Sequence, residues 1–276
     1  MTVAEASAVR AGVVPARRRR EVPSAVLGVV GLVVFAVVLE VVPRTGLVSE
    51  EYFPPFSRMV SALVDEAQTS AFWTAVGDTV TGWGLGLVLA LVAGIVVGMV
   101  LGSVDVLRRV TASTVEFLRP VPSVALIPLA VLVFGLGLQS TLLLVVYAAF
   151  WQVLIQVIYG VQDVDPVARD TARSYQLGRW ARVRYLVWPT ALPYVMTGVR
   201  LAAAVALILA VTAELIIGSP GLGHEIAVAQ SSGAVPLVYA LVIVTGLLGV
   251  LVNLGARALE RATLSWHASL RADIGG

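Results

Sequence analysis

Residues 164–193, VDPVARDTARSYQLGRWARVRYLVWPTALP, form the one long polar interruption between the hydrophobic runs of this chain. Asp165 followed by Pro166 predicts a helix start, because aspartate caps the first turn of a helix and proline suits its first position. Small or apolar residues then recur at the spacing of one helical face, and charged residues occupy the other face. Gly178 ends this run, and a second short amphipathic stretch follows before two prolines introduce the next apolar segment. We therefore expect two short amphipathic helices at a membrane surface, placed to contact a partner in the cytoplasm.

The overall composition is that of a membrane protein. Hydrophobic residues make up 58% of the 276 residues, charged residues make up 13%, and the mean hydropathy is +0.92. A soluble domain averages about 25% charged residues. All 19 basic residues are arginine and they cluster beside the apolar runs, so the isoelectric point near 9.2 indicates membrane topology and no nucleic-acid partner. The chain has no cysteine, which excludes disulfide bonds, thiolate metal sites and thiol nucleophiles.

Six apolar runs approach the length of a spanning helix, which needs about 20 mainly apolar residues. They cover residues 24–42, 80–102, 121–138, 142–161, 191–217 and 235–256. Glycine-containing breaks at 137–139 and 218–221 fit turns at the membrane surface. We predict an all-α polytopic membrane protein of about six transmembrane helices. Its transmembrane domain, 24–266, lies between a basic N-terminal tail, 1–23, and a C-terminal tail, 267–276.

The placement of arginine orients these helices. With the N-terminus inside, most arginines fall on the cytoplasmic side, as the positive-inside tendency requires. They are Arg10, Arg17 to Arg20, Arg108, Arg109, Arg169, Arg173, Arg179, Arg182, Arg184, Arg257, Arg261 and Arg271. Only Arg44 and Arg58 fall in outer loops. We expect both termini and the 163–190 loop to be cytoplasmic. The first apolar run resembles a signal peptide, but it is too long and lacks a small-x-small cleavage site, so a retained anchor is expected.

Small residues recur every four positions in the second apolar run. They are Gly86, Ala90, Gly94, Gly98 and Gly102. Such a stripe permits close helix packing within a bilayer. A helix that slides or faces a pathway is the alternative interpretation, and we expect the close helix contact.

The third apolar run contains three prolines within nine residues, at 120, 122 and 128. Prolines remove backbone donors and kink a helix, and a membrane tolerates this where the freed carbonyls are buried in protein or line a cavity. A substrate pathway and a kinked packing helix are therefore both open. Charged residues inside a bilayer are functional candidates unless they reach an interface. On these grounds the candidate pathway residues are Pro122, Ser123, Arg200 and Glu214.

Enzymatic motifs are missing from the sequence. There is no G-x-x-x-x-G-K-[ST] phosphate loop and no lysine to complete one, and neither H-E-x-x-H nor G-x-S-x-G occurs. The two histidines, His224 and His267, lie in separate parts of the chain. We expect no catalytic, cofactor-binding or metal-binding residue in this chain. If it takes part in energised transport, another chain must handle ATP.

From about residue 52 to 266, the chain resembles the membrane permease subunit of a binding-protein-dependent ABC importer, in the nitrate, sulfonate and taurine branch. The matching motifs occur in order: FPPFS (53–57), the glycine stripe, LRPVPSVALIPLAVLVFGLG (118–137), DVDP (163–166), AE (213–214) and GLG (221–223). Singly these motifs are weak, and together they are specific. The resemblance implies a type I importer permease fold.

The segment from Asp170 to Pro193 resembles the family's EAA loop, the cytoplasmic element that docks into a cleft on the ATPase. Asp170 stands at the glutamate position of that motif, and Thr171 and Ala172 stand at the two alanines. The face expected to dock comprises Val167, Ala168, Thr171, Ala172 and Tyr175. The glycine of the motif falls at Gln176, a departure, and Gly178 is expected to supply the backbone freedom instead. Gly178→Val should then impair coupling more than Gln176→Ala, because a β-branched residue resists a positive φ.

The resemblance also implies the surrounding assembly. A bacterial cell-membrane permease of this kind pairs with a second permease copy, two ABC ATPase subunits that bind ATP and magnesium, and an extracytoplasmic substrate-binding protein. Sulfonates, taurine, nitrate and polar heterocycles are solutes of such relatives. The alternatives are an ion-driven secondary transporter, expected to show paired intramembrane carboxylates or inverted repeats with broken helices, and a structural scaffold, which needs no patterned docking loop.

Overall fold

The computed structural model describes residues 24–264, which form helices and connecting loops with no strand. The tails expected at 1–23 and 267–276 lie outside the described residues. Five long helices dominate the chain: α1 (Ser24–Arg44), α3 (Ser70–Ser103), α6 (Leu138–Gln162), α9 (Trp188–Ile217) and α11 (Val235–Thr263). The shorter elements are α2 (Phe56–Glu66), α4 (Asp105–Leu118), η1 (Ser123–Leu126), α5 (Ile127–Phe134), α7 (Pro166–Ser174), α8 (Arg179–Arg182), η2 (Val183–Val187) and α10 (Leu222–Ser231).

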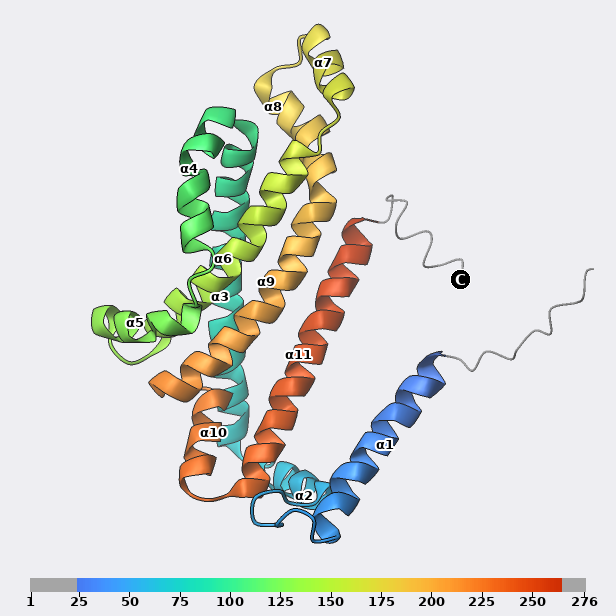
Figure 1. Cartoon of the computed structure of the whole chain (residues 1–276), viewed down its shortest axis with the longest axis vertical. Helices are drawn as coiled ribbons and strands as arrows, with labels where there is room; N and C mark the ends of the chain where they lie inside the picture. Colours follow the sequence, from blue (N-terminus) through green and yellow to red (C-terminus); the bar gives the residue numbers. More distant parts are fainter. Residues whose placement is uncertain (1–23, 265–276) are drawn as a thin grey trace, which may run out of the picture.

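Five helical segments of the described chain are long and apolar enough to cross a membrane, and there are six if one bent pair counts as a span. The predicted class, an all-α polytopic membrane protein, is confirmed. Figure 1 shows α3, α6, α9 and α11 side by side, with α7 at one end of the molecule and α2 and α10 at the other. We call these the loop end and the far end.

The expected spanning helix at 121–138 is wrong as a single helix. The residues form η1 and α5, which meet α4 at a bend of 84°. Prolines at 120 and 122 have no N–H to donate and disfavour helical continuation. Side chains of α6 contact carbonyls of this region: the Tyr147 hydroxyl donates to the Leu118 carbonyl, next to the break, at 2.7 Å, and Ser140 Oγ lies 2.5 Å from the Gly135 carbonyl and 3.0 Å from the Ala130 carbonyl, at the other end of α5. The break is therefore held in place by the neighbouring helix.

The glycine stripe of α3 lies directly against α6, so the expected close contact is confirmed. A Cβ built on Gly94 would lie 2.7 Å from Val153 Cβ, and one on Gly98 would lie 2.7 Å from Val157 Cβ. Real Cβ atoms do not approach this closely, so only glycine allows the helices to meet here. Gly86 and Gly102 repeat the arrangement at the two ends, against valines of α6 in the same register. We call this contact the α3–α6 seam.

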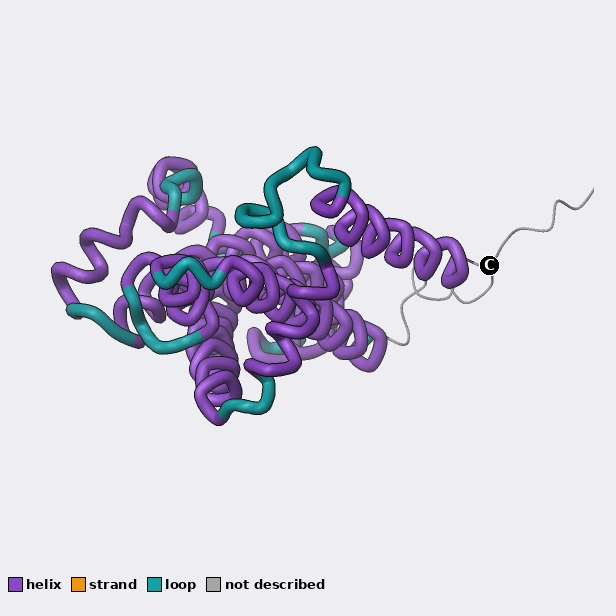
Figure 2. Tube along the Cα trace, turned by 90° about the horizontal axis from the view of Figure 1, so that it is seen from below, coloured by secondary structure: helices purple, strands orange, loops and turns teal. Residues whose placement is uncertain are grey.

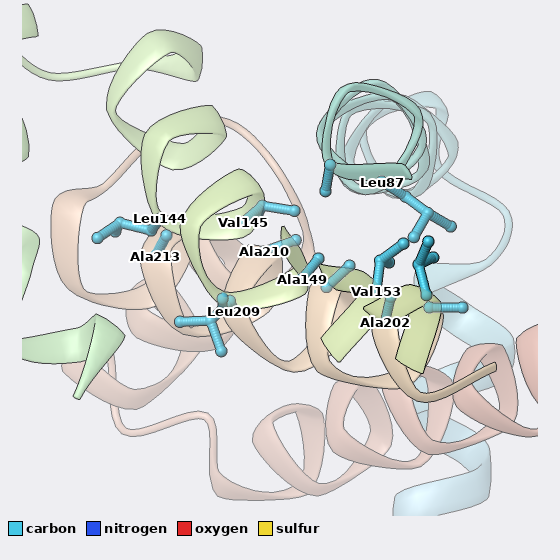
Figure 3. Packing of buried hydrophobic residues seen from close by; sticks show 14 of the residues in the cluster. Leu87, Leu144, Val145, Ala149, Val153, Ala202, Leu209, Ala210 and Ala213 are labelled. Atoms are coloured by element: carbon cyan, nitrogen blue, oxygen red, sulfur yellow. The ribbon is translucent and has the colours of Figure 1, made fainter. Parts of the chain in front are cut away.

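The central core combines α3, α6 and α9. Figure 3 shows buried residues that these three helices contribute, among them Leu87 of α3, Val145 of α6 and Ala210 of α9. Glycines again permit close approach, since a Cβ on Gly160 of α6 would lie 2.9 Å from the Ala191 Cα of α9. Membrane helices gain little from burying apolar surface, because lipid is apolar as well. Small side chains allow the close van der Waals packing that holds the helices together instead.

Helix α1 stands apart from this core, as Figures 1 and 2 show from two directions. Its described side chains are mostly exposed within the single chain. It is attached near its end: the Glu40 carboxylate accepts hydrogen bonds from the Ser57 backbone N–H at 2.8 Å and from Ser57 Oγ at 3.0 Å. Arg44 forms an ion pair with Glu40. These contacts join α1 to the start of α2.

Candidate functional site

The loop between α6 and α9 begins as the sequence predicts. The Asp165 carboxylate accepts a hydrogen bond from the Val167 N–H at 2.7 Å, and Pro166 occupies the first helical position of α7. The cap satisfies one of the N–H groups that have no partner at a helix start. The N-cap and proline prediction is confirmed.

The residues of the expected docking face of α7 are partly exposed and partly buried in the structure. Val167 and Tyr175 are 72% and 79% exposed, and Thr171 is exposed as well. Ala168 is half-buried, and Ala172 is only 6% exposed, so it packs inside the chain. A large side chain at Ala172 would therefore disturb the loop itself before it met any partner. The coupling role of these residues stays a prediction, with Val167 and Tyr175 best placed to contact another chain.

Asp170 lies on the exposed surface of α7. Its carboxylate pairs with Arg173, three residues further along the same helix, at 3.2 Å. An exposed pair of this kind contributes little to stability. Both side chains are thus free to exchange this contact for one with a partner.

The turn after α7 corrects the prediction made for Gly178. Gln176 itself adopts the left-handed conformation, with φ of +55°, whereas Gly178 has φ of −58°. The Leu177 N–H donates to the Ala172 carbonyl at 3.0 Å, and the Gln176 N–H donates to the Arg173 carbonyl at 2.9 Å. This is the Schellman arrangement, whose left-handed residue is usually glycine. Gln176 therefore keeps the backbone shape of the motif, and Gly178 does not replace it.

The second amphipathic helix expected in the loop is not a separate element. Residues of α8 and η2 run without a break into α9, giving one helical segment of 39 residues, Arg179–Ile217. The junction η2 is a π turn, in which the Trp188 N–H reaches the Val183 carbonyl. The expectation failed because two prolines precede the apolar run. In the structure the helix continues through both prolines: Pro189 lies just after the π turn, and Pro193 lies inside α9.

The four candidate pathway residues do not meet within one chain. Pro122 is exposed and Ser123 half-buried, both at η1. Arg200 pairs with Glu260 of α11 at 3.3 Å and lines a groove of about 480 Å³ between α9 and α11. Their pathway role stays a prediction. A larger hollow, about 640 Å³, lies between α3, α4 and α6 and is lined by Arg108, Glu116, Arg119 and apolar residues.

Glu214 has a set of contacts that the sequence analysis did not foresee. It lies at the far end of α9 and is 1% exposed. Its Oε2 accepts hydrogen bonds from Thr79 Oγ1 of α3 at 2.8 Å and from the Gly223 N–H of α10 at 3.0 Å. The sequence analysis gave two separate signals here, the Ala213-Glu214 and Gly221-Leu222-Gly223 motifs, and connected neither of them to Thr79. No group of three or more potential metal ligands occurs among the residues that the structure describes.

The structure thus combines a bundle of long apolar helices with a polar loop at one end, which exposes Val167 and Tyr175. Residues 90–265 match the family described as the inner membrane component of binding-protein-dependent transport systems. The chain belongs to this family. The predicted resemblance is confirmed.

Several curated permeases are similar to this chain. The taurine transport system permease protein TauC of Escherichia coli K12 is 31% identical over 230 residues, covering 82% of this chain and 84% of TauC. The putative aliphatic sulfonates transport permease protein SsuC of Bacillus subtilis 168 is 33% identical over 156 residues, 56% of each chain. The riboflavin transport system permease protein RibX of Chloroflexus aurantiacus is 31% identical over 163 residues, 59% of this chain and 61% of RibX.

Solved structures show that the fold is shared. An inward-facing form of the MetNI methionine ABC transporter matches with a TM-score of 0.62 and 18% identity, covering 71% of this chain and 97% of that chain. A bacterial ABC transporter that imports the acidic polysaccharide alginate matches with a TM-score of 0.63 and 14% identity, covering 87% and 96%. The chain therefore has the type I ABC importer permease fold.

Proposed function

We propose that this permease forms the membrane pathway of an ATP-driven importer for a small sulfonate. The observation that carries the proposal is the similarity to TauC along most of both chains. Similarity to SsuC supports the same solute class. The solute would reach the permease from an extracytoplasmic binding protein, as the family description implies.

Coupling to a separate ATPase is the second part of the proposal. The loop at 163–190 carries exposed apolar and aromatic side chains, notably Val167, Tyr175 and Trp180. Exposed aromatic side chains are favoured anchors in protein interfaces. The ATPase would bind ATP and magnesium, and its closure would move the loop end of this chain. The proposal places the loop and both termini in the cytoplasm, which the arginine asymmetry supports.

The working unit would be a pair of permease copies. Much apolar surface remains exposed in the single chain, including Leu132 at 83% in α5 and Leu129 at 53%. Lipid covers part of such surface, and a second copy would cover the protein-facing part. The pathway would then lie between the copies, which accounts for the separation of the candidate pathway residues within one chain.

The experiment is uptake by proteoliposomes containing this permease with its ATPase and binding protein. Taurine and an aliphatic sulfonate should accumulate when ATP is enclosed on the loop side, and nitrate and riboflavin should not. Accumulation of riboflavin alone would contradict the sulfonate proposal and favour a heterocycle, the solute type of RibX. Uptake driven by an ion gradient without ATP would favour a secondary transporter and remove the proposal.

A further inference from the structure

The far end of α9 is joined to two other helices through one buried carboxylate. Glu214 and Thr79 are 1% and 0% exposed, and Oε2 of Glu214 receives both of the hydrogen bonds described above. A buried carboxylate without partners costs several kcal/mol. The carboxylate therefore holds its two donors in place, and they come from different helices.

The direction of the hydrogen bonds follows from counting donors. The Leu222 N–H of α10 donates to Thr79 Oγ1 at 2.8 Å, so the Thr79 hydroxyl oxygen acts as an acceptor toward α10. Its own proton is then available to Glu214. The result is a closed set of bonds between α3, α9 and α10, which we call the Glu214 cluster: Thr79, Glu214, Leu222 and Gly223.

Two glycines allow the first turn of α10 to lie on Glu214. A Cβ on Gly221, whose φ is +147°, would lie 2.3 Å from Glu214 Cδ, and a Cβ on Gly223 would lie 2.2 Å from the Val211 carbonyl oxygen. Neither position accepts a larger residue without displacing α10. The first N–H groups of a helix carry partial positive charge, which favours a carboxylate there. Geometry and charge thus agree at this contact.

The same helix reaches the coupling loop. The helical segment Arg179–Ile217 is continuous over 39 residues, which at about 1.5 Å per residue spans roughly 60 Å. Its first residues belong to the loop at 163–190, and its last turn carries Glu214. One continuous helical segment therefore has the proposed ATPase contact at one end and the Glu214 cluster at the other (Figure 1).

We propose that Glu214 is a positioning residue that makes α10 move as one body with α9 and α3. A shift of the coupling loop would then reach the far end of the bundle, where the binding protein delivers its solute. Because Glu214 is only 1% exposed, the proposal gives it an action through α10 in place of the pathway role predicted from the sequence. This inference rests on the proposed function, because it assigns the far end to the binding protein.

The test compares matched variants in the complete complex of permease, ATPase and binding protein. Glu214→Ala and Thr79→Val remove the bonds, whereas Glu214→Gln and Thr79→Ser keep the acceptor or the hydroxyl. We expect Glu214→Ala and Thr79→Val to assemble with the ATPase but to lose the stimulation of ATP hydrolysis by loaded binding protein, by roughly five-fold or more. Glu214→Gln and Thr79→Ser should retain it. A merely structural role would lower assembly and stimulation together.

A second measurement follows α10 directly and does not depend on transport. The chain has no cysteine, and Ala229 of α10 is 2% exposed. In an Ala229→Cys background, a membrane-impermeant thiol reagent should label the far end poorly. Added Glu214→Ala should increase the labelling rate, and added Glu214→Gln should leave it low.

The outcomes separate the inference from the proposed function. Unchanged stimulation and unchanged labelling in Glu214→Ala would overturn the inference. Failure of both Glu214→Ala and Thr79→Val to assemble would also overturn it, because the cluster would then serve stability alone. If the unaltered complex shows no response to any binding protein, the proposed function fails, and the labelling experiment still tests the position of α10.

Discussion

Glycine is sterically required in the α3–α6 seam, and it is not required at Gly178 in the coupling loop. In the seam, glycines face valines at distances that exclude even one added methyl group. In the loop, Gly178 has nothing within 4 Å of an added Cβ, and the residue in the left-handed conformation is a glutamine. The seam residues are packed against each other within the chain, while the loop leaves side chains such as Tyr175 exposed. A glycine in the sequence is thus informative only when its neighbours or its φ require it.

The largest effect on stability is expected from a methyl group in the seam. Gly98→Ala places a Cβ 2.7 Å from Val157 Cβ, and overpacking of this kind costs about 1–3 kcal/mol. Unfolding in detergent, followed by circular dichroism, should show the loss. Adding Val157→Ala should recover part of it, because the two sites are in contact and not additive. Additive losses would show that the seam relaxes and would weaken the contrast with the loop.

A smaller effect, on binding only, is expected from the exposed loop surface. Tyr175→Ala should weaken association with the ATPase by about 1–2 kcal/mol, or roughly 5- to 30-fold in Kd. Stability should be unchanged because the side chain is 79% exposed. Tyr52→Ala, at the far end and 71% exposed, is the matched control and should bind normally. Equal weakening by both variants would remove the docking assignment.

The turn at Gln176 gives a still smaller effect with the opposite sign. A non-glycine residue in the left-handed region costs about 1–2 kcal/mol, and glycine loses about 0.5–1 kcal/mol more backbone entropy. Gln176→Gly should therefore stabilise the loop by about 0.5–1 kcal/mol. Slower hydrogen exchange at the Leu177 N–H, which closes the turn, would report it. Faster exchange would mean that the glutamine side chain contributes more than its backbone costs.

The smallest effect is expected at Gly178. Gly178→Ala adds the same methyl group as Gly98→Ala, but in open space and at a φ of −58°. A surface change of this kind stays within about 0.5 kcal/mol. Its ATPase affinity and stability should match those of the unaltered chain. A loss comparable to that of Gly98→Ala would restore the earlier expectation that Gly178 controls the turn.

Local chemistry was predictable from the sequence, and contacts between distant segments were not. Asp165 and Pro166 act within one turn, so their cap could be read directly. The prolines predicted a distortion near 121–138, but the contacts of Tyr147 and Ser140 with the broken region come from α6, which the local sequence does not show. Glu214 finds Thr79 across 135 residues of sequence, a separation that no periodicity reveals.

The turn at Gln176 shows a second limit. A left-handed conformation is rare for residues other than glycine, so the nearby Gly178 was the natural choice. The Schellman hydrogen bonds of α7 decide otherwise, because the turn begins where the helix ends. The sequence does not mark Ser174 as the last residue of α7, so the position of the turn could not be predicted from it.

The π turn η2 takes up one residue more than an α-helical turn at the same place. The five residues of Val183–Val187 therefore wind through about the same angle as four α-helical residues, which rotate the chain by about 100° each. Deleting one residue from this turn would return the segment to α-helical winding and leave α7 and α8 facing nearly the same side of α9. Deleting one residue from the regular part of α9 would instead rotate α7 and α8 by about 100° around the helix axis, and Tyr175 and Val167 would point toward another side of the molecule. The π turn is thus the one place in this described segment where a residue can be lost without turning the surface that meets the partner.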